Sequence, residues 1–373
     1  MIAKVLRKIG LGHAAYKLAA PFCSIKYGAS DHDRDVQEAF KLLENTSPDP
    51  ASSCFIQRRR SCTDEQSADL DIIIPAYNVE KYIGNCINSV LSQKTNYSFR
   101  VLVIDDGSTD DTGNILNSYN DISVIHQENR GFSGARNTGL EHATAEYIMF
   151  LDSDDQLCPG AIEALMGRAK EQDCAIVEGA YAEVNPEGQV LRRRSHTEGP
   201  VRATDLEGFA WGKVIRRELF SNLDFPIGYW YEDSIMRQVL YPLAESKNLT
   251  VAGTGETVLL YRQNPKGITR SSRGRSKSLD SLYITMQLFE DRKNFGLDIT
   301  ADYYDYILSM AVQTYSRTKF QSPEVQRAIF TVYADFLERN FSGWNTENRQ
   351  LRCLEKALRE RNYGDYLAYC QLH

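Results

Sequence analysis

Between residues 70 and 170, short apolar runs rich in β-branched residues alternate with segments of helical periodicity. The apolar runs predict strands at residues 70–74, 100–104, 122–125 and 147–151. The periodic segments predict helices within residues 79–91, 114–119, 133–142 and 159–170. Strands and helices that alternate at this spacing form βαβ units, which build a parallel sheet with helices on both faces. The alternation therefore predicts an α/β fold with a mainly parallel sheet.

The composition is that of an ordinary soluble globular protein, with 42% hydrophobic and 25% charged residues. The length of 373 residues is enough for two domains, or for one domain with appendages. Acidic residues outnumber basic ones by 50 to 43, so the chain lacks the basic surplus that a general nucleic-acid binder needs. No apolar run approaches the roughly eighteen residues of a transmembrane helix. The chain is therefore expected to be soluble or peripheral to a membrane, with no nucleic-acid partner.

The first thirty residues are basic and contain no acid. Four apolar residues share a helical face beside the basic ones, namely Ile2, Val5, Leu6 and Ile9. Two interpretations remain open: a helix on an anionic membrane surface, or a helix packed on the protein. His13 and Lys17 interrupt the apolar core that a signal peptide needs, and the cysteines show no C-x-x-C spacing. We therefore expect free thiols in a reducing cytoplasm.

The segments that follow the predicted strands carry the side chains suited to ligand binding, because open α/β sheets bind ligands beyond the carboxyl ends of their strands. After the first strand, the sequence PAYNVE at residues 75–80 lacks the glycines of a dinucleotide or phosphate loop. Tyr77 instead suits stacking on a base, and Glu80 suits a hydrogen bond with a ribose hydroxyl. After the second strand, Asp106 suits an N–H of a pyrimidine ring, although its neighbours also favour a simple turn and helix cap.

Three carboxylates follow the fourth strand, at Asp152, Asp154 and Asp155. Such close carboxylates repel one another unless a cation lies among them. Carboxylate and diphosphate oxygens are the ligands that Mg²⁺ and Mn²⁺ prefer, so this loop predicts a metal site. Farther along the chain, the basic residues from Arg262 to Arg270 are predicted to form a flexible flap that closes over the diphosphate or meets a phosphate-bearing acceptor. The basic residues beyond Arg270 are predicted to lie in a solvated connector.

Four motifs occur in order along this region: IIIPAYN-x-E, VLVIDDGSTDDT, NRGFSGARNTGL and YIMFLDSDD. Together they resemble the donor-binding half of the family-two inverting glycosyltransferases with the GT-A fold. The resemblance continues through the segments around Trp211 and Glu232 and covers roughly residues 70–270. It implies a GT-A domain at residues 70–270. Outside it, the composition predicts a basic N-terminal helix and linker at residues 1–69, and the helical pattern from about residue 280 predicts a C-terminal appendage at 271–373.

The resemblance also implies the roles of the donor-binding residues. Tyr77 would stack on uracil, Asp106 would bond its ring, and Glu80 and Asp152 would lie near the ribose. Arg136 would approach the donor phosphates or hold the acidic loop, with a structural salt bridge as the alternative. The full donor-binding set is Pro75, Ala76, Tyr77, Asn78, Glu80, Asp106, Arg136, Asp152 and Ser153.

For the metal and the chemistry, the resemblance implies that Asp154, with Asp152, would hold Mn²⁺ or Mg²⁺. Asp233 would be the catalytic base, and Glu232 would orient the base or the acceptor. Both acids also suit the start of a helix near Ser234, where negative charge is favoured. The two roles are compatible, because a residue that caps a helix is also held in a fixed direction.

The function implied is inverting, metal-dependent transfer of a single sugar from a nucleotide sugar, a UDP-sugar, to a hydroxyl of a glycan or lipid-linked acceptor. The implied setting is bacterial cell-surface polysaccharide synthesis in the cytoplasm, with a peripheral position on the inner membrane face. Processive synthases of this family carry Q-x-x-R-W, whereas no Arg-Trp pair follows Gln238. A sugar nucleotidyltransferase and a non-catalytic carbohydrate- or partner-binding protein remain as alternatives. The first needs a glycine-rich loop after the first strand, and the second predicts loss of a site acid.

Overall fold

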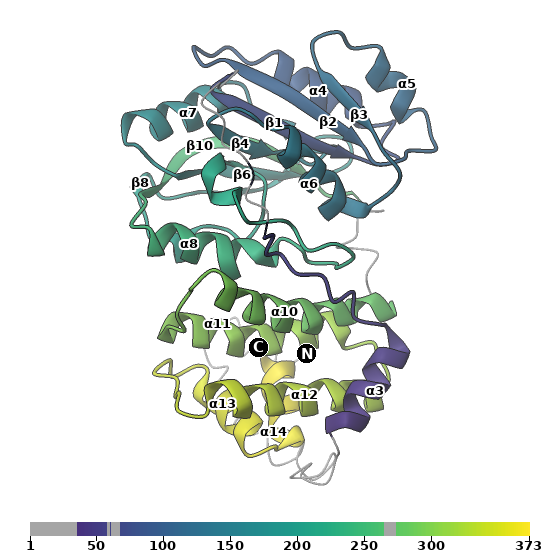
Figure 1. Cartoon of the computed structure of the whole chain (residues 1–373), viewed down its shortest axis with the longest axis vertical. Coiled ribbons are helices and arrows are strands. Elements are labelled where there is room, and N and C mark those ends of the chain that lie inside the picture. The colour runs from purple at the N-terminus through teal and green to yellow at the C-terminus, as the bar shows by residue number, and fades with distance from the viewer. Residues whose placement is uncertain (1–35, 58–59, 61–67, 265–273) are drawn as a thin grey trace. The chain divides into compact units, whose positions relative to one another are not determined.

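The structure is a computed structural model that describes residues 36–57, 60, 68–264 and 274–373 (Figure 1). The predicted basic N-terminal helix and most of the basic segment after Arg262 lie outside these residues. Contacts between residues divide the described chain into two units. One unit contains the sheet and spans residues 52–264 together with Gln287–Leu297. The other is helical and contains residues 36–51, 274–286 and 298–373.

The sheet unit is built on one mixed, mostly parallel sheet with the strand order β3-β2-β1-β4-β9-β6-β10-β5 (Figure 1). Neighbouring strands in the β3-β2-β1-β4 half are parallel, as are β6 and β10, whereas β9 is antiparallel to both β4 and β6. The predicted fold class is confirmed. The strands are β1 (Leu70–Ala76), β2 (Phe99–Asp105), β3 (Ser123–His126), β4 (Tyr147–Phe150), β5 (Gln156–Leu157), β6 (Ile176–Val184), β7 (Val190–Arg194), β8 (Gly199–Pro200), β9 (Lys213–Arg216) and β10 (Val251–Arg262).

Helices cover the sheet because its central strands are apolar on both faces. In β1, Ile72 and Ile74 join the core cluster that contains residues of α4 and α7, while Ile73 between them meets Gly139 of α6. Alternate side chains of a strand point to opposite faces, so every residue of β1 is buried. The helices of this unit are α4 (Ile83–Leu91), α5 (Thr112–Asn117), α6 (Gly131–His142), α7 (Ala161–Glu171) and α8 (Tyr241–Ser246), with 3₁₀ turns at Ala203–Asp205 and Arg217–Phe220 and a π-helical stretch, η3, at Met236–Leu240.

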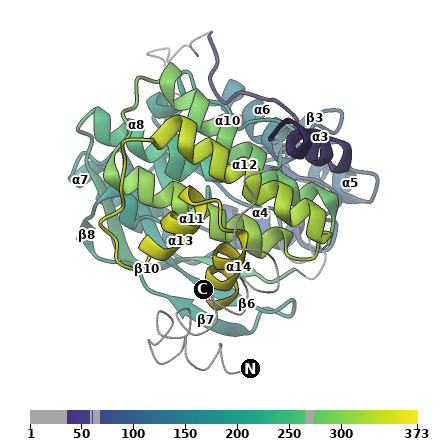
Figure 2. The same cartoon turned by 90° about the horizontal axis from the view of Figure 1, so that it is seen from below.

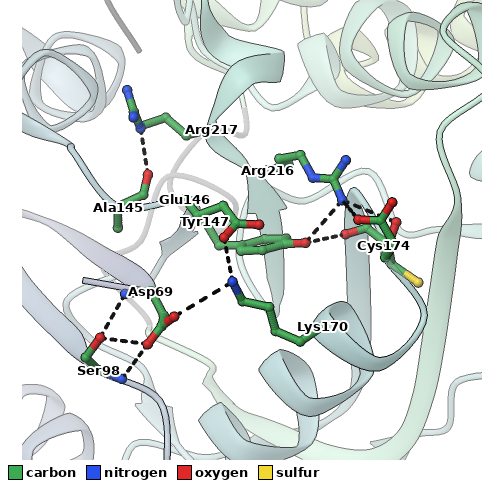
Figure 3. A network of polar contacts seen from close by, with 10 residues as sticks. Asp69, Ser98, Ala145, Glu146, Tyr147, Lys170, Cys174, Arg216 and Arg217 are labelled. Carbon is green, nitrogen blue, oxygen red and sulfur yellow. Dashed lines mark hydrogen bonds and ion pairs between the residues drawn. The ribbon is translucent and has the colours of Figure 1, made fainter. Parts of the chain in front are cut away.

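Polar contacts hold the amino ends of the central strands together (Figure 3). The hydroxyl of Tyr147, the first residue of β4, donates a hydrogen bond of 2.8 Å to the carbonyl of Cys174, just before β6. Lys170 of α7 lies 2.5 Å from the Glu146 carboxylate, and Arg217 donates to the Ala145 carbonyl at 2.6 Å. This end of the sheet is thereby closed by structural contacts, which leaves the carboxyl end for binding.

The helical unit packs around α12, which contacts α3, α11, α13 and α14 (Figure 2). Side-chain caps begin three of its helices: Thr300 accepts from the N–H of Tyr303, Ser322 from that of Val325, and Asn362 from that of Asp365. The helix α10 contributes residues to both units. The helical elements here are α3 (Val36–Thr46), a 3₁₀ turn (Ser276–Leu279), α10 (Asp280–Asn294), α11 (Ala301–Thr318), α12 (Pro323–Phe341), α13 (Arg352–Arg359) and α14 (Tyr363–Leu372).

The segment predicted as a linker is attached to the sheet unit over part of its length. Phe55 forms a β-bridge with Leu223, and the Cys54 N–H donates to the Asp291 carboxylate at 2.7 Å. All six described cysteines are free thiols. Within the described residues, no helix is both long and apolar enough to cross a membrane.

The close approach of α6 to β1 predicts that Gly139→Ala lowers the free energy of unfolding by about 1–3 kcal/mol. An added Cβ would lie 2.3 Å from Cγ2 of Ile73, so the helix or the strand has to move. Urea denaturation of the full chain measures the effect. In an Ile73→Ala background, which lacks the clashing Cγ2 atom, Gly139→Ala should cost less than it does in the wild type.

Gly84→Ala is the matched control, because Gly84 also lies in a helix but its added Cβ would meet only the Tyr119 hydroxyl, at 3.5 Å. Alanine is favoured over glycine in a helix by roughly 0.5–1 kcal/mol, so this variant should be as stable as the wild type or more so. A Gly139→Ala variant that unfolds no more easily than Gly84→Ala would show that α6 and β1 are not in close contact.

Candidate active site

Three loops start at the same edge of the sheet, because β1, β2 and β4 are parallel and in register there. Ala76 pairs with Asp105, and Ile73 pairs with Phe150. Pro75 and Ala76, two of the predicted donor-binding residues, are the last residues of β1 and are buried. Because these two residues are buried, the side chains that a ligand could reach come from the loops beyond them.

Asn78 joins the loop after β1 to the loop after β2. Its φ of 52° lies in the left-handed region, which asparagine tolerates better than most residues. Its side-chain oxygen accepts from the N–H of Thr109 at 2.8 Å, and its own N–H donates to the Ser108 hydroxyl at 3.1 Å. The preceding Tyr77 is 46% exposed. The two interlocked loops therefore present a large aromatic side chain to solvent at the edge of the sheet.

The Asp106 carboxylate is buried and accepts hydrogen bonds from the segment before α6. Its Oδ1 accepts from Gln127 at 2.6 Å and from the N–H of Arg130 at 2.8 Å, and among the described residues its Oδ2 has no donor. Glu80 lies at the rim of the same loop, where Oε2 accepts from the N–H of Asp111 at 3.1 Å. One oxygen of Asp106 thus remains available for a ligand N–H.

The acidic loop after β4 places three carboxylates in different surroundings. Asp155 is fully buried and Ser153 nearly so, whereas the Asp152 side chain is 25% exposed. The Oδ2 of Asp154 accepts from the Asn264 amide at 2.9 Å. Burial, together with the charge of Asp152, raises the pKa of Asp154, and burial raises that of Asp155 still more strongly. The loop therefore brings three carboxylates together where little water can screen them.

Arg262 holds this loop in place. Its N–H donates to Asp155 Oδ1 at 2.7 Å, its Nε to the carbonyl of Asp154 at 3.0 Å, and its Nη1 to the carbonyl of Pro186 at 2.6 Å. Arg262 is buried as the last residue of β10, so it is not part of the flexible flap that the basic sequence predicted. The residues that were predicted to form the rest of that flap, 265–270, lie outside the described structure.

Arg136 connects the acidic loop to a second acidic segment. Its Nη2 lies 2.9 Å from Asp152 Oδ1, and its Nη1 lies 2.5 Å from Glu232 Oε1. The guanidinium is 5% exposed and lies over the Phe225 ring, 5.3 Å from the centroid. Burial alone would lower the pKa of Arg136, but the two carboxylates outweigh it and raise the pKa. Of the roles inferred from the sequence, the observed contacts correspond to holding the acidic loop.

The second acidic segment is a turn with a strained backbone. Tyr231 has a φ of 66°, which costs energy for an aromatic residue and is typical of functional turns. Glu232 and Asp233 follow, both partly buried, and the helix begins at Ser234 as predicted. Glu232 directs its carboxylate to Arg136. The predicted base and its neighbour therefore lie in a turn that is tied to the acidic loop.

The helix after this turn begins with the π-helical stretch η3, a geometry that is common at functional sites. Arg292 of α10, buried in the same unit, donates from Nη1 to the carbonyl of Gln238 in this stretch at 2.5 Å. The turn is thus supported from its carboxyl side by a residue from a distant part of the chain.

A buried charge cluster centred on Lys213 supports the far half of the sheet. Lys213 is fully buried and contacts the Glu178 carboxylate, the Tyr241 hydroxyl at 2.6 Å and the carbonyl of Glu207 at 2.9 Å. Burial raises the pKa of Glu178, but Lys213 and His196 outweigh this and hold it below its usual value. His196 lies 3.0 Å from Glu178.

The donor set of the acidic loop fits a magnesium-like ion that is completed by substrate. Within the described ranges, no three His, Cys, Asp or Glu side chains converge closely enough to hold a metal by themselves. Mg²⁺ is typically bound through one or two carboxylates together with substrate phosphates and water. Asp154 keeps one carboxylate oxygen free of its Asn264 contact, and Asp152 is partly exposed. The chemistry of these residues therefore suits a cation that arrives with a phosphorylated ligand.

Residues 71–230 match the family model described as Glycosyl transferase family 2. This part of the chain belongs to glycosyltransferase family 2. The matched range holds the first three loops and Arg136, and it ends just before the strained turn. The family predicted from the four motifs is thereby confirmed.

Curated relatives of the glycosyltransferase domain come from bacteria. The chain is 34% identical over 198 residues to glycosyltransferase GlyA of Streptococcus pneumoniae, a match that covers 47% of this chain and 28% of GlyA. It is 28% identical over 257 residues to glycosyltransferase GlyG of the same organism, covering 62% of this chain and 83% of GlyG. The chain thus spans only about a quarter of the length of GlyA and most of the length of GlyG.

The fold is similar to that of S. aureus TarS 1–349, solved in complex with UDP-GlcNAc, with a TM-score of 0.60. The match covers 82% of this chain and 90% of the TarS chain at 19% sequence identity. This likeness confirms the predicted GT-A-type arrangement of a mostly parallel sheet flanked by helices.

Arg136 connects two of the predicted site segments, the acidic loop and the Glu232–Asp233 turn, and the structure adds residues that the sequence did not single out. The link from Arg136 to Glu232, the contact of Asn264 with Asp154 and the support from Arg292 are new. No sequence signal pairs Arg136 with Glu232, because the two come from different elements. The one available signal was a single arginine among mostly small residues in the helical segment GARNTG.

The contacts of Arg262 predict that Arg262→Ala lowers the free energy of unfolding by about 1–3 kcal/mol and loosens the acidic loop. The variant leaves backbone carbonyls and the buried Asp155 without their charged neighbour. Urea denaturation measures the stability, and hydrogen exchange of peptides that cover residues 150–158 measures the loop. Arg202→Ala is the matched control, because Arg202 is 73% exposed and its ion pair with Asp205 lies on the surface. Equal stability of the two variants would show that Arg262 does not hold the acidic loop in place.

Proposed function

We propose that this protein is an inverting, metal-dependent glycosyltransferase that moves one sugar from a UDP-sugar to a hydroxyl of a glycan or lipid-linked acceptor. The observation that carries the proposal is the pairing of Arg136 with Asp152, both inside the range that matches the family 2 model, and with Glu232 just beyond its end. It joins a loop suited to a metal and a diphosphate to a turn suited to a base. Such a pair of neighbouring sites is what direct transfer of a sugar requires.

The donor side of the proposal rests on the first two loops. Exposed Tyr77 stacks on the uracil, the open oxygen of Asp106 accepts from the ring N–H, and Glu80 and Asp152 contact the ribose. Support for a uridine donor comes from TarS, which was solved with UDP-GlcNAc and with UDP. The burial of Asp106 between Gln127 and Arg130 supports its role, because it fixes the direction of the carboxylate.

The chemical step places a general base opposite the leaving diphosphate. We assign Mn²⁺ or Mg²⁺ to Asp154 with Asp152, where it would offset the charge of the leaving group. Asp233 takes the proton from the acceptor hydroxyl, which typically accelerates such a step by about 10²–10⁴-fold. Glu232, fixed by Arg136, orients the turn that carries Asp233. The attack proceeds in line and needs no covalent intermediate.

The cellular setting follows from the substrates. Nucleotide sugars are made in the cytoplasm, and the bacterial relatives in the comparisons include glycosyltransferases of S. pneumoniae. We therefore place the enzyme in the cytoplasm, on the inner face of the membrane where lipid-linked acceptors of surface polysaccharides lie. The acceptor hydroxyl and the sugar transferred are the parts of the reaction that an activity screen has to identify.

The donor assignment predicts that UDP with Mn²⁺ raises the midpoint of thermal unfolding of the full chain, whereas CMP with Mn²⁺ does not. Ligand at about 100 times its Kd stabilises a protein by about 2.7 kcal/mol, which a thermal-shift assay detects readily. EDTA should abolish the shift. If no nucleoside diphosphate stabilises the protein in the presence of Mn²⁺ or Mg²⁺, the proposed function is wrong.

The division of roles predicts that Asp233→Asn abolishes transfer while the Kd for UDP with Mn²⁺ stays within about three-fold of the wild type. Asparagine keeps the size of the side chain but cannot accept the proton, so the loss should be about 10²–10⁴-fold in kcat. Asp154→Ala should instead weaken metal-dependent UDP binding.

Calorimetric titration with UDP and a radiolabelled transfer assay separate the two effects. The matched control is Asp173→Asn, an exposed acid at the opposite end of the sheet. Wild-type turnover by Asp233→Asn would transfer the role of base to Glu232.

A further inference from the structure

We infer that Arg136 is a positioning residue that couples the state of the acidic loop to the placement of the Glu232–Asp233 turn. A single guanidinium contacts both segments, with Nη2 at 2.9 Å from Asp152 and Nη1 at 2.5 Å from Glu232. Both ion pairs are largely removed from water, since the arginine side chain is 5% exposed and that of Glu232 is 13% exposed. A change in the charge beside Asp152 therefore alters the strength of the ion pair between Arg136 and Glu232.

The guanidinium cannot simply swing away from either partner. It lies over the rings of Phe225 and Phe132, with centroid distances of 5.3 and 5.9 Å. The next residue, Asn137, donates to the carbonyl of Phe225 and accepts from its N–H, both at 2.8 Å. Helix α6 and the segment around Phe225 thus hold Arg136 between the two carboxylates, so its charge is shared rather than moved.

Sharing one positive charge between two carboxylates makes their interactions with it competitive. In a poorly screened interior each ion pair is much stronger than in water, and its strength depends on the other charges nearby. A cation that contacts Asp152 neutralises part of that carboxylate, so Asp152 attracts Arg136 less and Glu232 attracts it more. Occupation of the acidic loop therefore tightens the turn, and by linkage a tighter turn favours occupation of the loop.

The turn is a segment that needs such support. Tyr231 has a φ of 66°, which an L-residue with a large side chain adopts only when its surroundings impose it. Through Glu232, Arg136 supplies an attachment directly after this residue. In the reaction proposed above, on which this part of the inference rests, the base Asp233 is then aligned most firmly when the donor and its cation are present.

The coupling is tested first without any ligand, by hydrogen exchange of the full chain in peptides that cover residues 228–240. Asp152→Asn removes the competing charge, so the amides of the turn should exchange about five-fold or more slowly than in the wild type. In an Arg136→Lys background the turn should exchange faster, and Asp152→Asn should no longer change it. Arg136→Lys is preferred to Arg136→Gln because it keeps a positive charge in the buried site while losing the two-sided geometry.

The control for this arm is Arg100→Lys, which disturbs another arginine paired with a buried carboxylate, Asp71, at the opposite end of the sheet. With α7 peptides as the internal reference, this variant should exchange in the 228–240 peptides at the same rate as the wild type. If Asp152→Asn does not slow exchange of the turn, or slows it equally in the Arg136→Lys background, the coupling is absent and the inference is overturned.

A second arm measures the coupling during the proposed reaction. UDP with Mg²⁺ should slow exchange of the turn in the wild type and not in Arg136→Lys. That variant should bind UDP with Mg²⁺ within a few-fold of the wild type, while its kcat falls by about 10²-fold because the base is misplaced. Glu232→Gln should reduce kcat to a similar extent, and the double variant should be no worse than either single one. Effects that multiply would show that the two residues act independently.

The two arms separate the inference from the proposed function. If the wild type binds no UDP and transfers no sugar, the proposed function fails, while the ligand-free exchange still decides whether Arg136 couples the two segments. If the wild type is active but Arg136→Lys loses UDP binding and turnover in equal measure, Arg136 serves the donor alone, and the inference fails while the proposed function stands.

Discussion

The repulsion among Asp152, Asp154 and Asp155 is the constraint on which the rest of the site depends. Three carboxylates at the end of one buried strand would expand or displace the loop unless positive or donor groups offset them. The described structure offsets each one differently: Arg136 contacts Asp152, Asn264 donates to Asp154, and the main chain of Arg262 donates to Asp155. These partners come from α6 and from the end of β10, so the loop is held from two sides of the sheet.

This arrangement explains why the two ends of the sheet differ. At the amino ends, Tyr147 and Arg217 connect the strands through hydrogen bonds to carbonyls, and Lys170 forms an ion pair with Glu146. At the carboxyl ends, three carboxylates lie close together in the acidic loop, and burial and neighbouring carboxylates raise the pKa values of Asp154 and Asp155. A bound cation with its ligand would reduce the repulsion among these carboxylates, so this end of the sheet is the one suited to binding.

Backbone strain and buried charge meet at the turn that precedes the π-helical stretch. Tyr231 takes a left-handed conformation, Glu232 pairs with Arg136, and Arg292 donates to a carbonyl of η3. Each contact involves a different element, so the turn is defined by tertiary contacts and not by local propensity. Such over-determined, strained segments are typical of places where a side chain must be aimed rather than merely packed.

The sequence by itself determined the order of strands and helices, because the pattern of apolar residues follows the periods of 2 and 3.6 that the backbone imposes. The predicted strand at residues 70–74 is β1, Leu70–Ala76. The motifs also determined the family, since loop residues such as Asp106 and Asp152 stand at fixed places after strands. Both are local properties that one segment of chain can encode.

Only the tertiary structure decided which side chains share their charge. Arg262 was expected in a flap and is instead a buried clamp at the end of β10, because a basic run has no period that distinguishes a strand end from a loop. The sequence left the partner of Arg136 undetermined. Its pairing with Glu232 depends on how α6 packs beside the segment around Phe225. An ion pair between distant elements depends on distances that no local pattern contains, and so it becomes visible only when the sheet and its helices are assembled.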